Sequence, residues 1–120
     1  MIWRRVPPAE QLPPDPVTGE IVPKGSAFRT KGTEDGVSIG VAAQYLAGGL
    51  GPEAMLAPEG CDQTWGVLEI TVREVRAVGL EVGLDPDDTG HGLVFPPPPS
   101  GKSRRLSKSA RWALHPRPAT

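Results

Sequence analysis

The stretch from residue 64 to residue 95 constrains the fold most, because apolar runs alternate there with turn residues over 32 consecutive positions. Residues 64–70 (T-W-G-V-L-E-I) are dense in β-branched and aromatic side chains, which is typical of a strand. Residues 80–84 and 91–95 alternate in the same way, and the sequence D-P-D-D-T-G between them is typical of a turn. The stretch therefore predicts a small core built on strands.

A short helix interrupts these strands. Thr71 is followed three residues later by Glu74, the spacing of a capping box, in which hydroxyl and carboxylate bond the exposed N–H groups of the first turn. Three valines follow at helical spacing, and Gly79 stands where a left-handed residue commonly ends a helix. The pattern predicts a helix over residues 72–78.

Length and composition predict a single domain over residues 1–120, with its order concentrated in the middle. Gly and Pro together make up 30 of 120 residues, and the prolines gather near both ends of the chain. We expect a core over about 26–95 and loosely held termini. The flanking parts are a Pro-rich irregular segment (7–25), in which Thr18 and Gly19 form a loop or turn a small hairpin, a polyproline spacer (96–101) and a basic tail helix (102–120).

The predicted fold class is α+β, with a small mixed sheet and short packed helices. Strands are expected near residues 2–6, 37–41, 65–70, 80–84 and 91–95, and helices near 41–47, 52–57, 72–78 and 103–114. The predicted core consists of Phe28, Val37, Ile39, Leu46, Leu56, Val67, Leu68, Ile70, Val75, Val78, Leu80, Val82, Leu93 and Val94.

Charge divides the chain into two parts of opposite sign. Residues 1–99 hold seven basic and fourteen acidic side chains, a net charge of −7, whereas residues 100–120 hold six basic side chains and no acid. Ser103 is expected to cap the tail helix. Two interpretations stay open, of which the first is favoured: the tail docks on its own acidic body, or it is presented to an anionic partner.

The tail also supplies the predicted contacts to a partner. Its basic side chains suit an acidic protein surface or nucleic-acid phosphates, and Trp112 is suited to anchor the tail or to stack on a base. The overall pI near 6.1 argues against a dedicated nucleic-acid domain. The candidate contact residues are Lys102, Arg104, Arg105, Lys108, Arg111 and Trp112.

A second cluster of chemically active residues falls in the turn after residue 84. Asp85, Asp87, Asp88 and His91 lie within seven residues, and carboxylate oxygens with one imidazole are ligands that divalent metals accept. The spacing matches neither an EF-hand nor the paired histidines of zinc hydrolases, so a plain acidic turn is favoured and no cofactor is expected. His91 is the candidate catalytic residue, as an acid–base group.

Cysteine content and hydropathy bear on the compartment. Cys61 is the single cysteine and cannot form an internal disulfide, which is typical of a reducing cytosol. No apolar run approaches the roughly 18 to 20 residues that cross a bilayer, and the first residues lack the apolar region of a secretory signal. We expect a cytoplasmic protein without a membrane partner.

Several short motifs link the chain to other sequences: R-R-V-P-P at 4–8, S-A-F at 26–28, D-G-V-S at 35–38, D-P at 85–86, G-H-G-L-V at 90–94 and R-W at 111–112. In these motifs the chain resembles a group of short uncharacterised bacterial single-domain proteins. The resemblance implies a bacterial single domain and no particular activity.

The leading functional hypothesis is a non-enzymatic protein-interaction or adaptor module of a bacterial cytosolic system. It follows from the lack of a phosphate-binding G-x-x-x-x-G-K-[ST] motif, a C-x-x-C pair or another convergent catalytic set in the sequence. The alternatives are a nucleic-acid-binding accessory protein that uses the basic C-terminal helix, and a small metal-assisted hydrolase centred on His91.

Overall fold

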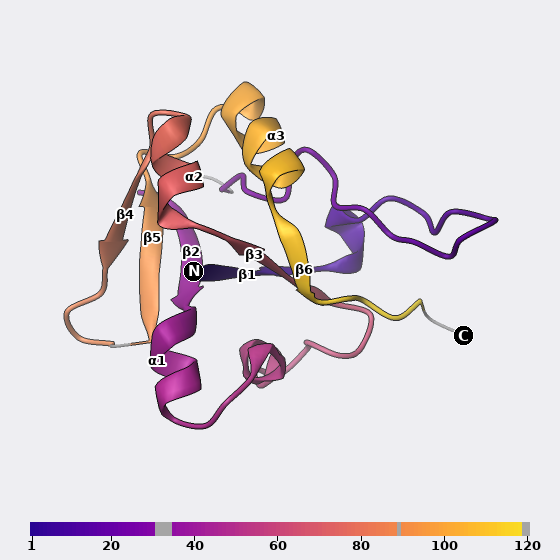
Figure 1. Ribbon diagram of the computed structural model, residues 1–120, viewed down its shortest axis with the longest axis horizontal. Coiled ribbons are helices and arrows are strands. Elements are labelled where there is room, and N and C mark those ends of the chain that lie inside the picture. The colour runs from indigo at the N-terminus through magenta and orange to yellow at the C-terminus, as the bar shows by residue number, and fades with distance from the viewer. Residues whose placement is uncertain (31–34, 89, 119–120) are drawn as a thin grey trace.

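The computed structural model describes residues 1–30, 35–88 and 90–118, which form a six-stranded sheet with three short α-helices (Figure 1). The elements are β1 (Ile2–Val6), η1 (Pro8–Glu10), β2 (Val37–Val41), α1 (Ala42–Ala47), η2 (Pro52–Leu56), β3 (Gly66–Ile70), α2 (Val72–Ala77), β4 (Glu81–Leu84), β5 (His91–Phe95), α3 (Ser100–Ser109) and β6 (Arg111–Leu114), where η marks a 3₁₀-helix. The strand order is β4-β5-β2-β1-β3-β6. The predicted α+β class is confirmed.

The sheet is antiparallel at each pairing among the described strands, so the prediction of a mixed sheet is wrong. Helix α2 joins β3 to β4. The two strands do run in the same direction, but β1, β2 and β5 lie between them. Strands that run the same way are therefore never neighbours.

Strand β1 lies inside the sheet and is buried on both faces. It pairs with β3 from Ile2 opposite Ile70 to Val6 opposite Gly66, and with β2 on its other side. Ile2 and Val6 belong to the cluster on one face, whereas Trp3, only 2% exposed, belongs to the cluster on the other. The core prediction omitted these side chains because their cover comes from segments distant in sequence.

Each face of the sheet is covered by its own helices. The larger cluster packs Val75 of α2 and Leu106 of α3 on side chains such as Phe28 and Ile39. The smaller cluster joins Trp3 and Val67 to Ala42 of α1 and Met55 of η2. In Figure 1, α2 and α3 lie together at the top of the molecule and α1 lies at the bottom.

The start and end of α2 confirm the local prediction. The hydroxyl of Thr71 accepts the Glu74 N–H at 3.0 Å, and the Glu74 carboxylate accepts the Thr71 N–H at 3.0 Å. Gly79 follows with a φ of +80°, a conformation that favours glycine. The capping box and this glycine set the limits of the helix.

The tail differs from the predicted helix over 103–114. Helix α3 begins at Ser100 and ends at Ser109, and the next residues form β6, which pairs with β3. Residues 106, 110 and 114 have helical spacing, but the backbone turns extended at Ala110, where β3 offers an unpaired edge. The polyproline spacer is correspondingly shorter, ending at Pro99, and Pro98 within it is buried.

Ser103 lies inside α3 and does not cap it. Its side chain is 0% exposed, donates to the Gly25 carbonyl at 2.7 Å and accepts the Phe28 N–H at 3.2 Å. These two bonds tie α3 to the chain segment before β2. The tail thus docks on its own body, and the expectation of a loosely held C-terminal segment is wrong.

The Pro-rich segment is more ordered than predicted, because it folds back as a hairpin. The Leu12 N–H donates to the Val22 carbonyl at 2.9 Å, and the Asp15 N–H donates to the Glu20 carbonyl at 2.8 Å. Gly19, at a φ of +74°, makes the turn. Of the two forms expected for Thr18 and Gly19, the hairpin is therefore the one observed.

Most of the predicted core is buried, with two clear errors. Leu46 is 60% exposed. Leu93 is 37% exposed because it lies on the sheet face that carries Trp3 and Val67, here called the second sheet face, beyond the cover of α1 and η2. Leu56, Val78 and Val82 are partly buried against the two clusters. The residues confirmed as buried are Phe28, Val37, Ile39, Val67, Leu68, Ile70, Val75, Leu80 and Val94.

Candidate functional site

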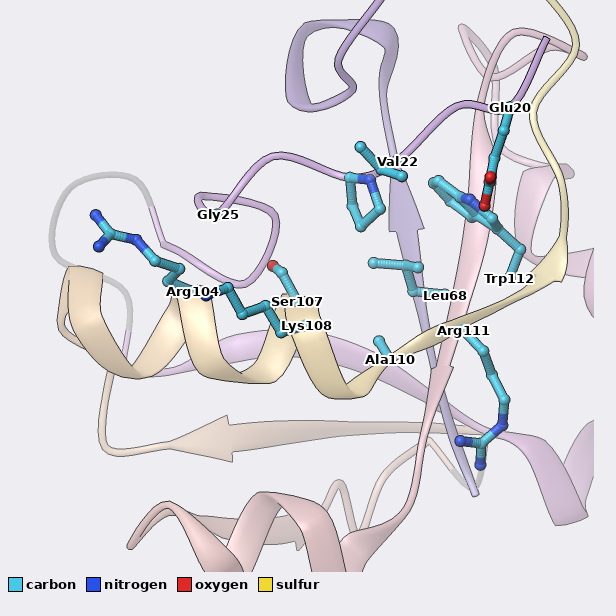
Figure 2. Close-up of a pocket in the computed structure, with 11 residues that line it drawn as sticks. Glu20, Val22, Gly25, Leu68, Arg104, Ser107, Lys108, Ala110, Arg111 and Trp112 are labelled. Atoms are coloured by element: carbon cyan, nitrogen blue, oxygen red, sulfur yellow. The ribbon is translucent and has the colours of Figure 1, made fainter. Parts of the chain in front are cut away.

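A cleft of about 540 Å³ opens between α3, the start of β6 and the incoming segment 20–25 (Figure 2). We call it the α3 cleft. Its lining is Glu20, Val22, Pro23, Gly25, Leu68, Arg104, Ser107, Lys108, Ala110, Arg111 and Trp112. The cleft exists because Ser103 holds α3 against residues 25–28 while β6 holds the following residues on β3.

The rim of the α3 cleft is cationic. Arg104 and Lys108 lie one turn apart on α3, both are exposed, and neither has an ion pair within the described residues. Arg111 is partly neutralised, because its guanidinium lies 3.5 Å from Glu69 and 3.8 Å from Glu74. Figure 2 shows Arg104 and Arg111 extending from opposite ends of the cleft. Arg104 and Lys108 therefore carry its available positive charge.

The floor of the α3 cleft is apolar and fixed. The Trp112 indole N–H donates to the Ile21 carbonyl at 2.7 Å, and its ring packs directly over Gly66, where a Cβ would stand 2.3 Å from the ring. Leu68 and Val22 complete the surface. Trp112 thus anchors the tail, as expected from its sequence, through this hydrogen bond and its packing on Gly66.

Four of the six predicted contact residues line the α3 cleft, namely Arg104, Lys108, Arg111 and Trp112. Lys102 lies elsewhere, with its ammonium 3.1 Å from the position a Cβ on Gly79 would take, near the end of α2. Arg105 is exposed on α3 and lines none of the cavities described below. Sequence reasoning missed Glu20, Val22 and Pro23, because the hairpin brings them to α3 without any local signal.

The acidic turn brings His91 and Asp88 together. His91 Nδ1 lies 2.5 Å from Asp88 Oδ2, and the side chains are 46% and 54% exposed. Asp85 instead accepts the Asp87 N–H within the turn at 2.9 Å. Thr89, part of the predicted turn, lies outside the described residues. A histidine with a carboxylate partner can serve as an acid or base.

The turn does not form a metal centre in the described part of the chain. No group of three or more His, Cys, Asp or Glu side chains lies there in positions that could hold a metal ion. The proposed ligands Asp85, Asp87, Asp88 and His91 therefore do not converge on a common point. The Asp85 and Asp88 carboxylates accept backbone N–H groups of the turn, and Asp88 also bonds the His91 ring.

His91 and Ser38 both line two adjacent cavities on the second sheet face. One, of about 470 Å³, also includes Asp88 and Phe95, and the other, of about 360 Å³, includes Arg5. The register places Ser38 opposite Leu93 and Gly40 opposite His91, so Ser38 and His91 share this face on neighbouring strands. No local pattern in the sequence links these two residues, because their proximity depends on strand pairing.

Comparison with known proteins adds no family: no protein-family model, curated protein or solved structure matches the chain. The resemblance to short bacterial proteins stays a prediction. Among the described helices, none has the length and apolarity to cross a bilayer.

Proposed function

We propose that the protein is a non-enzymatic interaction module that binds an acidic segment of a partner protein in the α3 cleft. The observation that carries the proposal is the pair Arg104 and Lys108, which have no ion pair in the described residues and stand above an apolar floor. An acidic segment with an apolar side chain complements both parts. We place the module in a bacterial cytosol, which its single cysteine fits.

A protein partner suits the cleft better than nucleic acid. Val22 and Leu68 suit an apolar side chain of a peptide and offer no planar surface to a base. The indole N–H of Trp112 is bonded to the Ile21 carbonyl, so it is not available to hydrogen-bond the edge of a base. Nucleic acid is retained as the alternative that the binding experiment must separate.

The test measures binding of the full chain to short labelled peptides by fluorescence anisotropy. The probe is a peptide of Asp and Glu with one central Leu, compared with its Leu→Ala form, a Lys-rich form of equal length and a single-stranded DNA oligonucleotide. We expect the first peptide to bind best. Preference for the Lys-rich peptide, or equal binding of the Leu→Ala form, contradicts the proposal.

Adjacent residues of α3 provide a matched pair of variants. Arg104→Glu and Arg105→Glu change the net charge equally on the same helix, but only Arg104 lines the cleft. Arg104→Glu should weaken the peptide about tenfold, the scale of one charge-assisted hydrogen bond, whereas Arg105→Glu should have a much smaller effect. The nucleic-acid alternative is supported if both variants lose affinity equally and if the logarithm of the DNA affinity falls linearly with the logarithm of the salt concentration.

A hydrolase centred on His91 is the second candidate, favoured by the 2.5 Å contact between its ring and Asp88 beside two cavities. In this candidate His91 acts as the general acid or base. His91→Gln should leave folding unchanged, since an exposed pair contributes little to stability. Loss of ester hydrolysis in that variant supports the candidate, and its retention removes it.

A further inference from the structure

The cavity of about 360 Å³ on the second sheet face has the size of a small-molecule site. We call it the Arg5 cavity. It lies on the face opposite α2 and α3, over β1 and β2, and its lining is completed by residues of α1, η2 and β5 and by Ala57 and Pro58 after η2. It is separate from the α3 cleft, so the inference below is independent of the proposed function.

The polar lining of the Arg5 cavity consists of Arg5, Ser38, Tyr45 and His91, and no Asp or Glu lines it. This is unexpected, since residues 1–99 carry a net charge of −7. Arg5 is half-buried, donates to the Met55 carbonyl at 3.5 Å and has no ion pair in the described residues. A half-buried guanidinium without a carboxylate is a favourable place for an anion.

Two hydroxyl groups accompany Arg5. Neither the Ser38 nor the Tyr45 side chain forms a hydrogen bond to another described residue, so both are available as donors. The Tyr45 ring is held in place by Trp3, with ring centroids 5.6 Å apart. Asp88 accepts the His91 Nδ1–H, so Nε2 of the neutral ring is an acceptor and His91 is not one of the donors. The hydrogen-bond donors Arg5, Ser38 and Tyr45 thus come from β1, β2 and α1, and all three line the Arg5 cavity.

The remaining side chains that line it are apolar, with Met55, Ala54 and Pro58 among them, whereas the Ile39 side chain belongs to the cluster on the opposite face. A ligand that fits must therefore combine an anionic head with an apolar body. We propose that the Arg5 cavity binds a small organic anion, a carboxylate or a phosphate monoester on an aromatic or aliphatic body. Arg5 bonds the anionic oxygens, the two hydroxyls orient them, and the Met55 side contacts the body.

The test follows amide chemical shifts of the ¹⁵N-labelled full chain during titration with benzoate, phenyl phosphate and the neutral benzyl alcohol. We expect saturable shifts in β2, α1 and η2 with at least one of the two anions, which identifies the preferred head group. Benzyl alcohol should bind at least about tenfold more weakly, because it cannot form the charge-assisted bonds. The proposal is overturned if neither anion saturates the shifts below about 10 mM. It is also overturned if the shifts are confined to α3 or if benzyl alcohol binds equally well.

Three variants locate the site. Arg5→Gln should weaken the anion about tenfold or more, the loss expected for a charge-assisted hydrogen bond. Tyr45→Phe keeps the ring on Trp3 and removes only the hydroxyl, so it reports on the site even if Arg5→Gln folds poorly, and it should weaken binding about threefold or more. Arg73→Gln on α2, an exposed residue outside the cavity, should leave the affinity unchanged. Unchanged affinity in Tyr45→Phe, or in a folded Arg5→Gln, overturns the proposal.

Discussion

Trp112 lies so close to Gly66 that a methyl group on the glycine would stand 2.3 Å from the indole ring. The Pro116 side chain would be 2.9 Å from the same methyl group. Gly66 begins β3, and Trp112 lies in β6, the strand that brings the tail onto the sheet. The absence of a side chain at Gly66 therefore decides whether the floor of the α3 cleft can form.

Gly66→Ala should destabilise the protein by about 1 to 3 kcal/mol, the usual cost of overpacking a filled region. Urea unfolding measures the loss. Gly101→Ala is the control, because nothing lies within 4 Å of a Cβ there and alanine favours the helix α3. A Gly66→Ala protein as stable as wild type would contradict the packing of Trp112 described above.

Ser103 and Ser107 lie one turn apart on α3, and both are buried, but their hydroxyls differ. Ser103 bonds Gly25 and Phe28, whereas the Ser107 hydroxyl has no partner within the described residues. Ser103→Ala leaves two buried backbone groups without a bond and should cost about 1 to 3 kcal/mol. Ser107→Ala should be neutral or stabilising. Similar urea midpoints for the two variants would show that the bonds to residues 25–28 do not hold α3.

The capping box of α2 provides a local test. Thr71→Ala removes the acceptor for the Glu74 N–H and should cost about 0.5 to 2 kcal/mol. Thr71→Ser keeps the hydroxyl and should recover most of that loss. Thermal unfolding of the three proteins distinguishes the cases, and an alanine variant equal to wild type would show that the cap does not contribute to stability.

Acid should destabilise the protein through exposed carboxylates at turns and at the β4 edge. The Thr64 hydroxyl and N–H lower the pKa of Asp62 below its ordinary value of 3.8, and the Arg76 guanidinium lowers the pKa of Glu81 below 4.5. A lowered folded-state pKa contributes stability above the ordinary value, and this stability is lost as pH falls through the folded-state pKa. Urea midpoints should therefore drop below about pH 4, and the drop should be smaller in Asp62→Asn.

The features predicted from sequence were those set by neighbours in the chain. Thr71 and Glu74 are three residues apart, and their bonds need nothing else to form. Five of the six described strands were also found, because alternation of apolar residues is visible locally. The sixth, β6, was missed because residues 106, 110 and 114 imitate a helix, and only the distant edge of β3 makes an extended backbone favourable there.

The candidate sites were less predictable because their residues come from segments that are distant in sequence. The basic residues of the α3 cleft were visible in the sequence, but Val22 and Leu68 come from two other parts of the chain. Arg5 and Ser38 lie on separate strands, and only the pairing of the sheet brings them and His91 around one cavity. Charge can be read from a sequence, whereas the absence of a nearby counter-charge cannot.

The position of β1 bears on how the chain folds during synthesis. This strand leaves the ribosome before either of its partners, since β2 begins at Val37 and β3 at Gly66. Until both are made, Ile2 and Trp3 have no cover and both edges of the strand lack hydrogen-bond partners. Strand pairings so distant in sequence raise the contact order and slow folding. The apolar side chains of Ile2, Trp3 and Val6 can therefore be buried only after residues 66–70 have been made.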